Sequence, residues 1–326
     1  MKTLQTSNSL TTFGWLVKRE YWESRGGFFW AQFWAAAAIL ILIVLGIVVG
    51  EVFRVRAGLD WSLNSTINHF SPSDTANMGG VPGFGVALFA GIAGVVLTFV
   101  VFFYLLGALY DDRRDRSVLF WKSLPLSDIG TVLSKVCAAI LVAPLIAIVI
   151  VLVAFVVAQI ILSLWLLAHG INPFGLLWAH SEPYSIWFHM LVMIGVNAIW
   201  ALPTVGWLLF WSAAARSKPF LWAIIVPVIA GVLNFFIALI GLPHIRYEFY
   251  WGDIAGRLLL SIVPGSWISP DARNFTPHFG NPGHVGVIDF PAMGQALMLP
   301  QMWIGAAVGI VLIAAAIWFR RWRDES

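Results

Sequence analysis

The stretch GVALFAGIAGVVLTFVVFFYLLGALYDDRRDR, residues 85–116, decides the fold of this chain. Residues 85–109 contain no Asp, Glu, Lys, Arg or His, and six charged residues then follow within Asp111–Arg116. A helix that crosses about 30 Å of hydrocarbon needs roughly 20 consecutive apolar residues. The apolar part is therefore long enough to span a membrane, and the charged part marks the point where the span meets water.

The same pattern of long apolar runs recurs along the whole chain. Its 326 residues are 60% hydrophobic and 11% charged, with a mean hydropathy of +0.86, whereas soluble domains carry about 25% charged residues. The sequence therefore predicts an all-α integral membrane protein that forms a single transmembrane domain. Its six predicted transmembrane helices lie at 28–50, 85–109, 136–167, 186–212, 219–242 and 301–319.

Two segments have an ambiguous length. Run 136–167 is long for one crossing and too short for two crossings joined by a turn, so we count it once and expect it to tilt or to project beyond the bilayer. Residues 254–268 are too short to span, and they contain Arg257 and Pro264. We interpret this second segment as re-entrant or interfacial.

The distribution of Lys and Arg predicts the orientation. Of the 19 basic residues, 14 fall on one side of the six spans, and basic residues are retained on the cytoplasmic side of a membrane. We therefore expect a multi-pass protein of the cytoplasmic (inner) membrane with both termini in the cytoplasm. The outer segments are then 51–84, 168–185 and 243–300, which we expect to form a small cap.

Motifs that would indicate catalysis within this chain are missing from the sequence. No GxxxxGK[ST] motif, HExxH motif or cysteine pair occurs, so we expect no nucleotide hydrolysis by that route, no catalytic residues and no metal site. The single cysteine, Cys137, cannot form an internal disulfide. The net charge of +3 reflects the bias between the two sides of the membrane and gives no indication of nucleic-acid binding.

Among the polar residues inside the predicted spans, we single out Gln159, Asn197 and Asn234. Polar groups in hydrocarbon need hydrogen-bond partners, and they can also line a substrate path. We favour interhelical hydrogen bonds for these side chains and keep a translocation path as the alternative.

The charged loop after run 85–109 has two interpretations. It can be a solvated loop anchored by Trp121, or a docking site with a charged rim and an apolar centre at Val118–Trp121. A plain loop needs neither the apolar ridge nor the density of both charge signs, so we favour docking. Pro125 then ends the segment, and Ser127 or Asp128 is placed to cap the next helix.

This loop and the six-span topology resemble the permease subunit of ABC transporters of the type-two exporter class. Residues 16–30 resemble the N-terminal interfacial helix of that family, although Glu20 interrupts their apolar face. The loop matches the cytoplasmic coupling helix between spans 2 and 3, through Asp112, Arg113, Arg114, Asp115, Arg116, Leu124, Pro125, Ser127 and Lys135.

The resemblance implies a division of labour between subunits. A separate ABC ATP-binding subunit would hold ATP and Mg and dock on the loop, and a second permease chain, identical or related, would complete the pathway in the membrane lipid. The arginines Arg113, Arg114 and Arg116 would contact acidic groups at the rim, and Asp112 and Asp115 would set the register. Phe120 and Trp121 would fill the groove of the partner.

Two other classes of function stay open. The first is a self-sufficient transporter or channel, although no acidic residue lies inside a span to couple protons or sodium. The second is a membrane-embedded enzyme that uses polar residues of the outer segments, but their spacing fits no arrangement of nucleophile and base. The residues considered for this enzyme are His180, Glu182, His278, His284 and Asp289.

Overall fold

The computed structural model describes five parts of the chain, residues 9–58, 80–115, 127–179, 182–267 and 290–323. Every regular element in these parts is helical. Six helices are long and apolar enough to cross a membrane: Thr11–Arg56, Phe84–Arg114, Asp128–Ala168, Ile186–Ala214, Pro219–Leu239 and Pro300–Trp322. The predicted all-α class and the count of six candidate spans are confirmed.

The helix of the first span begins well before the predicted run 28–50. Helix α1 (Ser9–Arg25) continues through a short π-helical segment, η1 (Gly26–Ala31), into α2 (Gln32–Arg56). Helix α5 (Gly80–Gly107) runs beside α2 and ends just before the short helix α6 (Tyr110–Arg114). At 1.5 Å per residue α5 is about 42 Å long, which exceeds the hydrocarbon layer.

The long third run forms one continuous helical segment, as predicted when run 136–167 was counted as one crossing. Its parts are α8 (Asp128–Cys137), the π-helical segment η2 (Ala138–Val142) and α9 (Ala143–Ala168). Ser127 caps this segment, because its side chain accepts a hydrogen bond from the Gly130 amide at 3.0 Å. Proline disturbs the preceding turn of a helix, and the π-helical segment ends two residues before Pro144.

Helices α10 (Glu182–Ala214) and α15 (Pro300–Arg323) form the most extensive helix pair. A short π-helical segment, η3 (Phe174–Trp178), precedes α10. The two helices touch through glycines, since a Cβ atom added to Gly206 would lie 2.5 Å from the Gly309 carbonyl oxygen. Small residues allow such close approach of helices in membranes.

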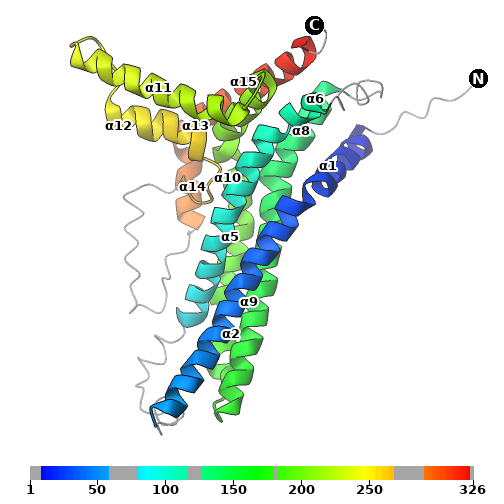
Figure 1. Cartoon of the computed structure of the whole chain (residues 1–326), viewed down its shortest axis with the longest axis vertical. Coiled ribbons are helices and arrows are strands. Elements are labelled where there is room, and N and C mark those ends of the chain that lie inside the picture. Colours follow the sequence, from blue (N-terminus) through cyan, green and yellow to red (C-terminus); the bar gives the residue numbers. More distant parts are fainter. Residues whose placement is uncertain (1–8, 59–79, 116–126, 180–181, 268–289, 324–326) are drawn as a thin grey trace, which may run out of the picture.

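Helix α11 (Pro219–Leu239) leaves the bundle at a steep angle to α2, α5 and α9 (Figure 1). The chain then returns beneath it through α12 (Tyr247–Phe249), η4 (Tyr250–Ala255) and α13 (Gly256–Leu260), and later forms α14 (Phe290–Met298). Asn234 closes this hairpin, because its side chain bonds both the amide and the carbonyl of Ile245, at 2.9 and 2.8 Å. Residues 256–260 of the segment predicted to be re-entrant or interfacial form the short helix α13, and turns follow at 261–267.

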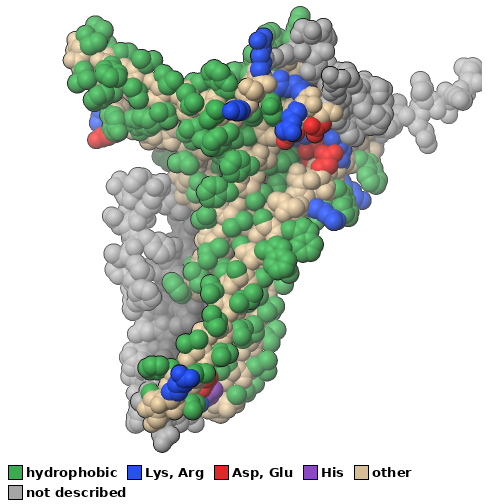
Figure 2. All heavy atoms as spheres, in the orientation of Figure 1, with side chains coloured by type: hydrophobic (Ala, Val, Ile, Leu, Met, Phe, Trp, Pro, Cys, Tyr) green, Lys and Arg blue, Asp and Glu red, His purple; other side chains and the backbone are tan. Residues whose placement is uncertain are grey.

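Charged side chains gather at the two ends of the bundle, and a smaller charged group lies beside α12 at the far end of α11 (Figure 2). One end carries the start of α1, helix α6, the start of α8 and the end of α15, and a broad apolar flank separates it from the small charged group at the end of α2. The largest cluster of buried apolar side chains lies near the first end and includes Phe28, Leu105, Leu109, Val132 and Leu208. This core anchors the helices that position the charged loop.

Candidate functional site

The described part of the charged loop is helical at its start. Asp112, Arg113 and Arg114 belong to α6, and Asp115 follows its last turn. Arg114 and Asp115 are exposed, whereas Asp112 and Arg113 are partly buried. Arg116, Phe120 and Trp121 lie outside the described residues.

A network of charged and polar side chains, most of them buried or partly buried, lies directly behind α6, and we call it the loop cluster: Glu20, Tyr104, Asp112, Asp128, Lys135 and Arg320. At its centre the Lys135 ammonium lies 3.2 Å from a Glu20 carboxylate oxygen and 3.4 Å from one of Asp112. The side chains of Glu20 and Lys135 are only 2% and 3% exposed. The Tyr104 hydroxyl donates to the same Glu20 oxygen at 2.8 Å, so one carboxylate oxygen joins α1, α5 and α8.

The last helix joins the same network. The Arg320 guanidinium lies 3.5 Å from Asp112 and 3.1 Å from Asp128, and its side chain is 5% exposed. Asp112 therefore contacts two cations, one from α8 and one from α15. Because ion pairs in a poorly hydrated site are stronger than at an open surface, the loop cluster holds the four helices in a defined arrangement around α6.

Arg113 connects α6 to the end of α10. Its guanidinium donates to the carbonyl oxygens of Ser212 at 2.6 Å and Ala215 at 3.1 Å. The Ser212 hydroxyl in turn accepts hydrogen bonds from the amides of Leu109 and Tyr110. A cation at a helix C-terminus interacts favourably with the helix dipole, so Arg113 has an internal, stabilising contact in addition to any contact with a partner.

Sequence reasoning missed several members of the loop cluster. Glu20 was noted only as an interruption of an apolar face, and Lys135 only as part of the family match. In the structure these two residues pair with each other, 115 positions apart in the chain. Two features of the sequence could have indicated this pair. Glu20 is a charged residue on an otherwise apolar helix face, and Lys135 is a basic residue at the inner end of an apolar run.

An acidic cleft of about 720 Å³ opens between α1, α5 and α6. Its carboxylates are Glu20, Glu23, Asp111, Asp112 and Asp115. Lys135, which lies at its base, is the one basic residue among the residues that line it. The cleft therefore suits a basic side chain presented beside the loop.

The three polar residues singled out from the spans lie in separate places. Gln159 donates to the Leu177 carbonyl, and Asn234 closes the turn after α11. Asn197 accepts hydrogen bonds from the Trp267 indole at 2.8 Å and from the Gly265 amide at 3.3 Å. All three side chains are thus hydrogen-bonded, but only Gln159 bonds to another helical segment, η3, whereas the partners of Asn197 and Asn234 lie in turns and loops.

No group of three or more His, Cys, Asp and Glu side chains in the described ranges is arranged to hold a metal ion. Of the residues considered for an enzyme, His180, His278, His284 and Asp289 lie outside the described residues. Glu182 begins α10.

Comparisons with protein-family models, with curated proteins and with solved structures found no match to this chain.

Proposed function

We propose that this chain is the membrane-spanning permease subunit of an ATP-driven ABC exporter, in which a separate ATP-binding subunit docks at the charged loop. The observation that carries the proposal is the loop cluster: α6, the first helix of the proposed docking loop, is joined by ion pairs to α8 and α15, and Arg113 joins it to α10. A movement of the loop would therefore act directly on these three helices. Rigid-body movement of packed helices is a common way to transmit such a change.

In this proposal the end of the bundle that carries α6 faces the cytoplasm. The exposed groups Arg114 and Asp115 contact the ATP-binding subunit, and the acidic cleft receives one of its basic side chains. ATP and Mg are held by that subunit, so this chain is not itself an enzyme. A second permease chain, identical or related, completes the pathway in the lipid of the cytoplasmic membrane.

A self-sufficient transporter or channel is the second candidate. The observation in its favour is a cavity lined by Arg257 between α10, α13 and α15, since a charged side chain among membrane helices is a feature of substrate pathways. A transporter of this kind would carry out transport without an ATP-binding partner. Purification from the native membrane separates the two candidates.

The test compares the proteins that accompany two variants of the tagged chain. The double variant Arg114→Glu/Asp115→Arg exchanges the charges of two exposed loop residues and keeps the net charge unchanged. Arg56→Glu is the control, because Arg56 is also exposed and lies at the opposite end of the bundle. Each chain is purified in mild detergent, and the accompanying proteins are identified by mass spectrometry.

A soluble protein with a GxxxxGK[ST] motif should accompany the parent and the Arg56→Glu control. It should be depleted at least several-fold from the double variant, because like charges then face each other across the interface. If the parent chain is purified alone, even after gentle crosslinking, the permease proposal is wrong and the purified chain is tested for transport by itself.

A further inference from the structure

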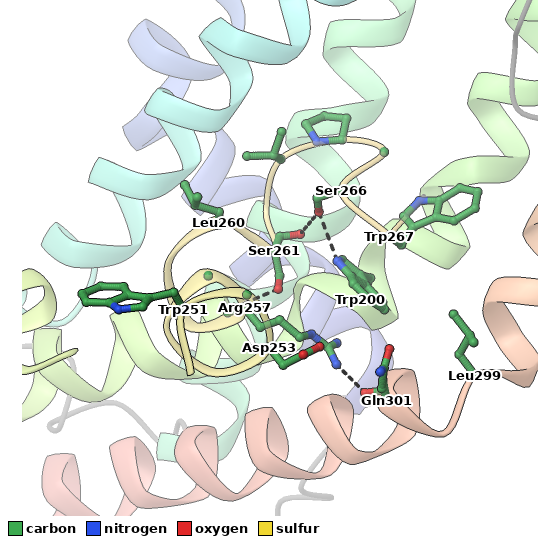
Figure 3. Close-up of a pocket in the computed structure, with 15 residues that line it drawn as sticks. Trp200, Trp251, Asp253, Arg257, Leu260, Ser261, Ser266, Trp267, Leu299 and Gln301 are labelled. Carbon is green, nitrogen blue, oxygen red and sulfur yellow. Dashed lines mark hydrogen bonds between the residues drawn. The ribbon is translucent and has the colours of Figure 1, made fainter. Parts of the chain in front are cut away.

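A cavity of about 880 Å³ lies where α13 packs against α10 and the start of α15. Its size falls within the roughly 300–1,000 Å³ of pockets that hold small organic ligands. Three indole rings line it, those of Trp200, Trp251 and Trp267, together with two charged side chains, Asp253 and Arg257 (Figure 3). Aromatic walls around a few charged groups are typical of a binding site.

Arg257 is the polar centre of this pocket, and its hydrogen-bonding capacity is only partly used. Its guanidinium carbon lies 3.9 Å from the centre of the Trp200 ring, and Nη1 donates to the Gln301 carbonyl. The buried Nε and Nη2 atoms find no acceptor in the described part of the chain. Both atoms are covered by neighbouring groups, with Nη2 packed beside Gly305. Because buried donors without acceptors are unfavourable, an oxyanion that enters from the cavity and displaces this cover gains two parallel hydrogen bonds.

The aromatic wall is fixed before any ligand arrives. The Trp200 indole donates to the Ser266 hydroxyl at 3.1 Å, and the Trp267 indole donates to Asn197 at 2.8 Å. Both rings are therefore held in one orientation by these hydrogen bonds. Such preorganisation lowers the entropy that a ligand must lose on binding.

The depth of the pocket in the membrane follows from its position along α10. Trp200 precedes Ser212 by twelve residues, and Ser212 contacts the start of the charged helix α6. At 1.5 Å per residue this separation is about 18 Å, well inside a hydrocarbon layer of about 30 Å. A ligand of Arg257 would thus lie among the spans, where an ionisable side chain commonly marks a binding site.

Asp253 limits the charge of the ligand. It precedes Arg257 by one helical turn and lines the same pocket, but none of the ion pairs in the described part of the chain joins it to Arg257. Its carboxylate repels anions, and the repulsion increases with the charge of the ligand. A ligand with one negative charge fits this pair of side chains better than a dianion.

We propose that this pocket binds an amphiphile whose headgroup carries a single negative charge, as a carboxylate or a phosphodiester. Arg257 holds the oxyanion, and the apolar tail lies against the tryptophan rings. Binding by the isolated chain does not depend on the proposed function. The further step, that this amphiphile is the class of substrate the protein translocates, rests on the proposed function.

Binding is measured by native mass spectrometry of the full chain in a neutral detergent. The probes are dioctanoyl phosphatidylglycerol, dioctanoyl phosphatidylcholine with the same tails and no net charge, and decanoate, a monoanion that is not a phospholipid. We expect one phosphatidylglycerol to bind at least tenfold more tightly than phosphatidylcholine. Tight binding of decanoate as well would identify the ligand class as general anionic amphiphiles, and its absence would restrict the class to phospholipids.

Three variants and a control connect this binding to the pocket. Arg257→Gln should weaken phosphatidylglycerol binding at least tenfold, and Asp253→Asn should strengthen it several-fold. Gly305→Ala should weaken it while keeping the charge, because a Cβ atom there would contact the Arg257 guanidinium. Arg56→Gln, which removes an exposed arginine at the end of α2, should leave binding unchanged.

The proposal is overturned if phosphatidylcholine binds as tightly as phosphatidylglycerol, or if neither anion binds. It is also overturned if Asp253→Asn and Gly305→Ala both leave the affinity unchanged, a result that stays informative even if Arg257→Gln does not fold. The measurement uses no ATP and no partner subunit. A negative result in this measurement therefore does not contradict the proposed ATP-binding partner. Equally, a failure to find that partner does not contradict ligand binding in this pocket.

Discussion

The Lys135 ammonium pairs with carboxylates of two helices, Glu20 of α1 and Asp112 of α6. It lies within 3.4 Å of both Glu20 and Asp112, and its side chain is 3% exposed. The loop cluster contains three carboxylates, Glu20, Asp112 and Asp128, and two cations, Lys135 and Arg320. Removing one cation leaves buried negative charge uncompensated, which is far more costly than losing an exposed ion pair.

Lys135→Met should therefore lower the free energy of unfolding by about 3–5 kcal/mol. The double variant Glu20→Gln/Lys135→Met should recover part of this loss, because it removes the unpaired charge together with its partner. Stability is measured as the melting temperature of the tagged chain in detergent by fluorescence-detected gel filtration.

The control for this pair is Glu23→Gln. Glu23 is half exposed and pairs with Arg19 on the same helix, so its loss should change stability by about 0–1 kcal/mol. Equal melting temperatures for the Lys135→Met variant and the double variant would contradict the assigned role of the pair.

At the scale of elements, the contact between α10 and α15 depends on the absence of side chains. A Cβ atom added to Gly309 would contact the backbone of Leu202, which cannot move aside as a flexible side chain would. Gly46 on α2 has open space around its Cα atom and provides a matched control. The two glycines both lie in helices, but only one lies where two helix backbones meet.

Gly309→Val should destabilise the protein by about 1–3 kcal/mol, since overpacking forces the two helices apart. Gly46→Val should have a much smaller effect in the same melting assay. An equal effect of both substitutions would indicate that valine in a helix, and not the helix contact, causes the loss.

At the scale of the whole molecule, the charge distribution predicts how the protein lies in the membrane. Lys18 and Arg321 are exposed at the end that carries α6, and Arg56 is exposed at the opposite end. We expect the first end in the cytoplasm, because basic residues are retained there. Cys137, the single native cysteine, is replaced by serine so that introduced cysteines report their own positions.

In this background, a membrane-impermeant maleimide should label Arg56→Cys in intact spheroplasts. Lys18→Cys and Arg321→Cys should be labelled only after the membrane is permeabilised. The reverse pattern would show that the orientation is wrong, and labelling of all three from outside would show that the ends are not separated by the bilayer.

The candidate spans could be predicted from the sequence because a span is a local property. Residues 85–109 are apolar over a length that matches hydrocarbon thickness, and this criterion needs no knowledge of neighbours. Two further predictions were confirmed: run 136–167 forms one span, and Ser127 caps its helix. Both could be made from the sequence because they depend on residues close together in the chain. The docking role of the loop and the identity of its partner stay predictions.

Only the tertiary structure brought Glu20 to Lys135, Asp112 to Arg320 and Arg257 to Trp200. The members of each pair are separated by many residues, and their pairing depends on which helices pack together and how they are rotated about their axes. Hydropathy contains neither quantity, because lipid and a neighbouring helix are both apolar surroundings for a span. Local composition was thus sufficient for the membrane segments, whereas the loop cluster and the arginine pocket required the packing of helices that are distant in the chain.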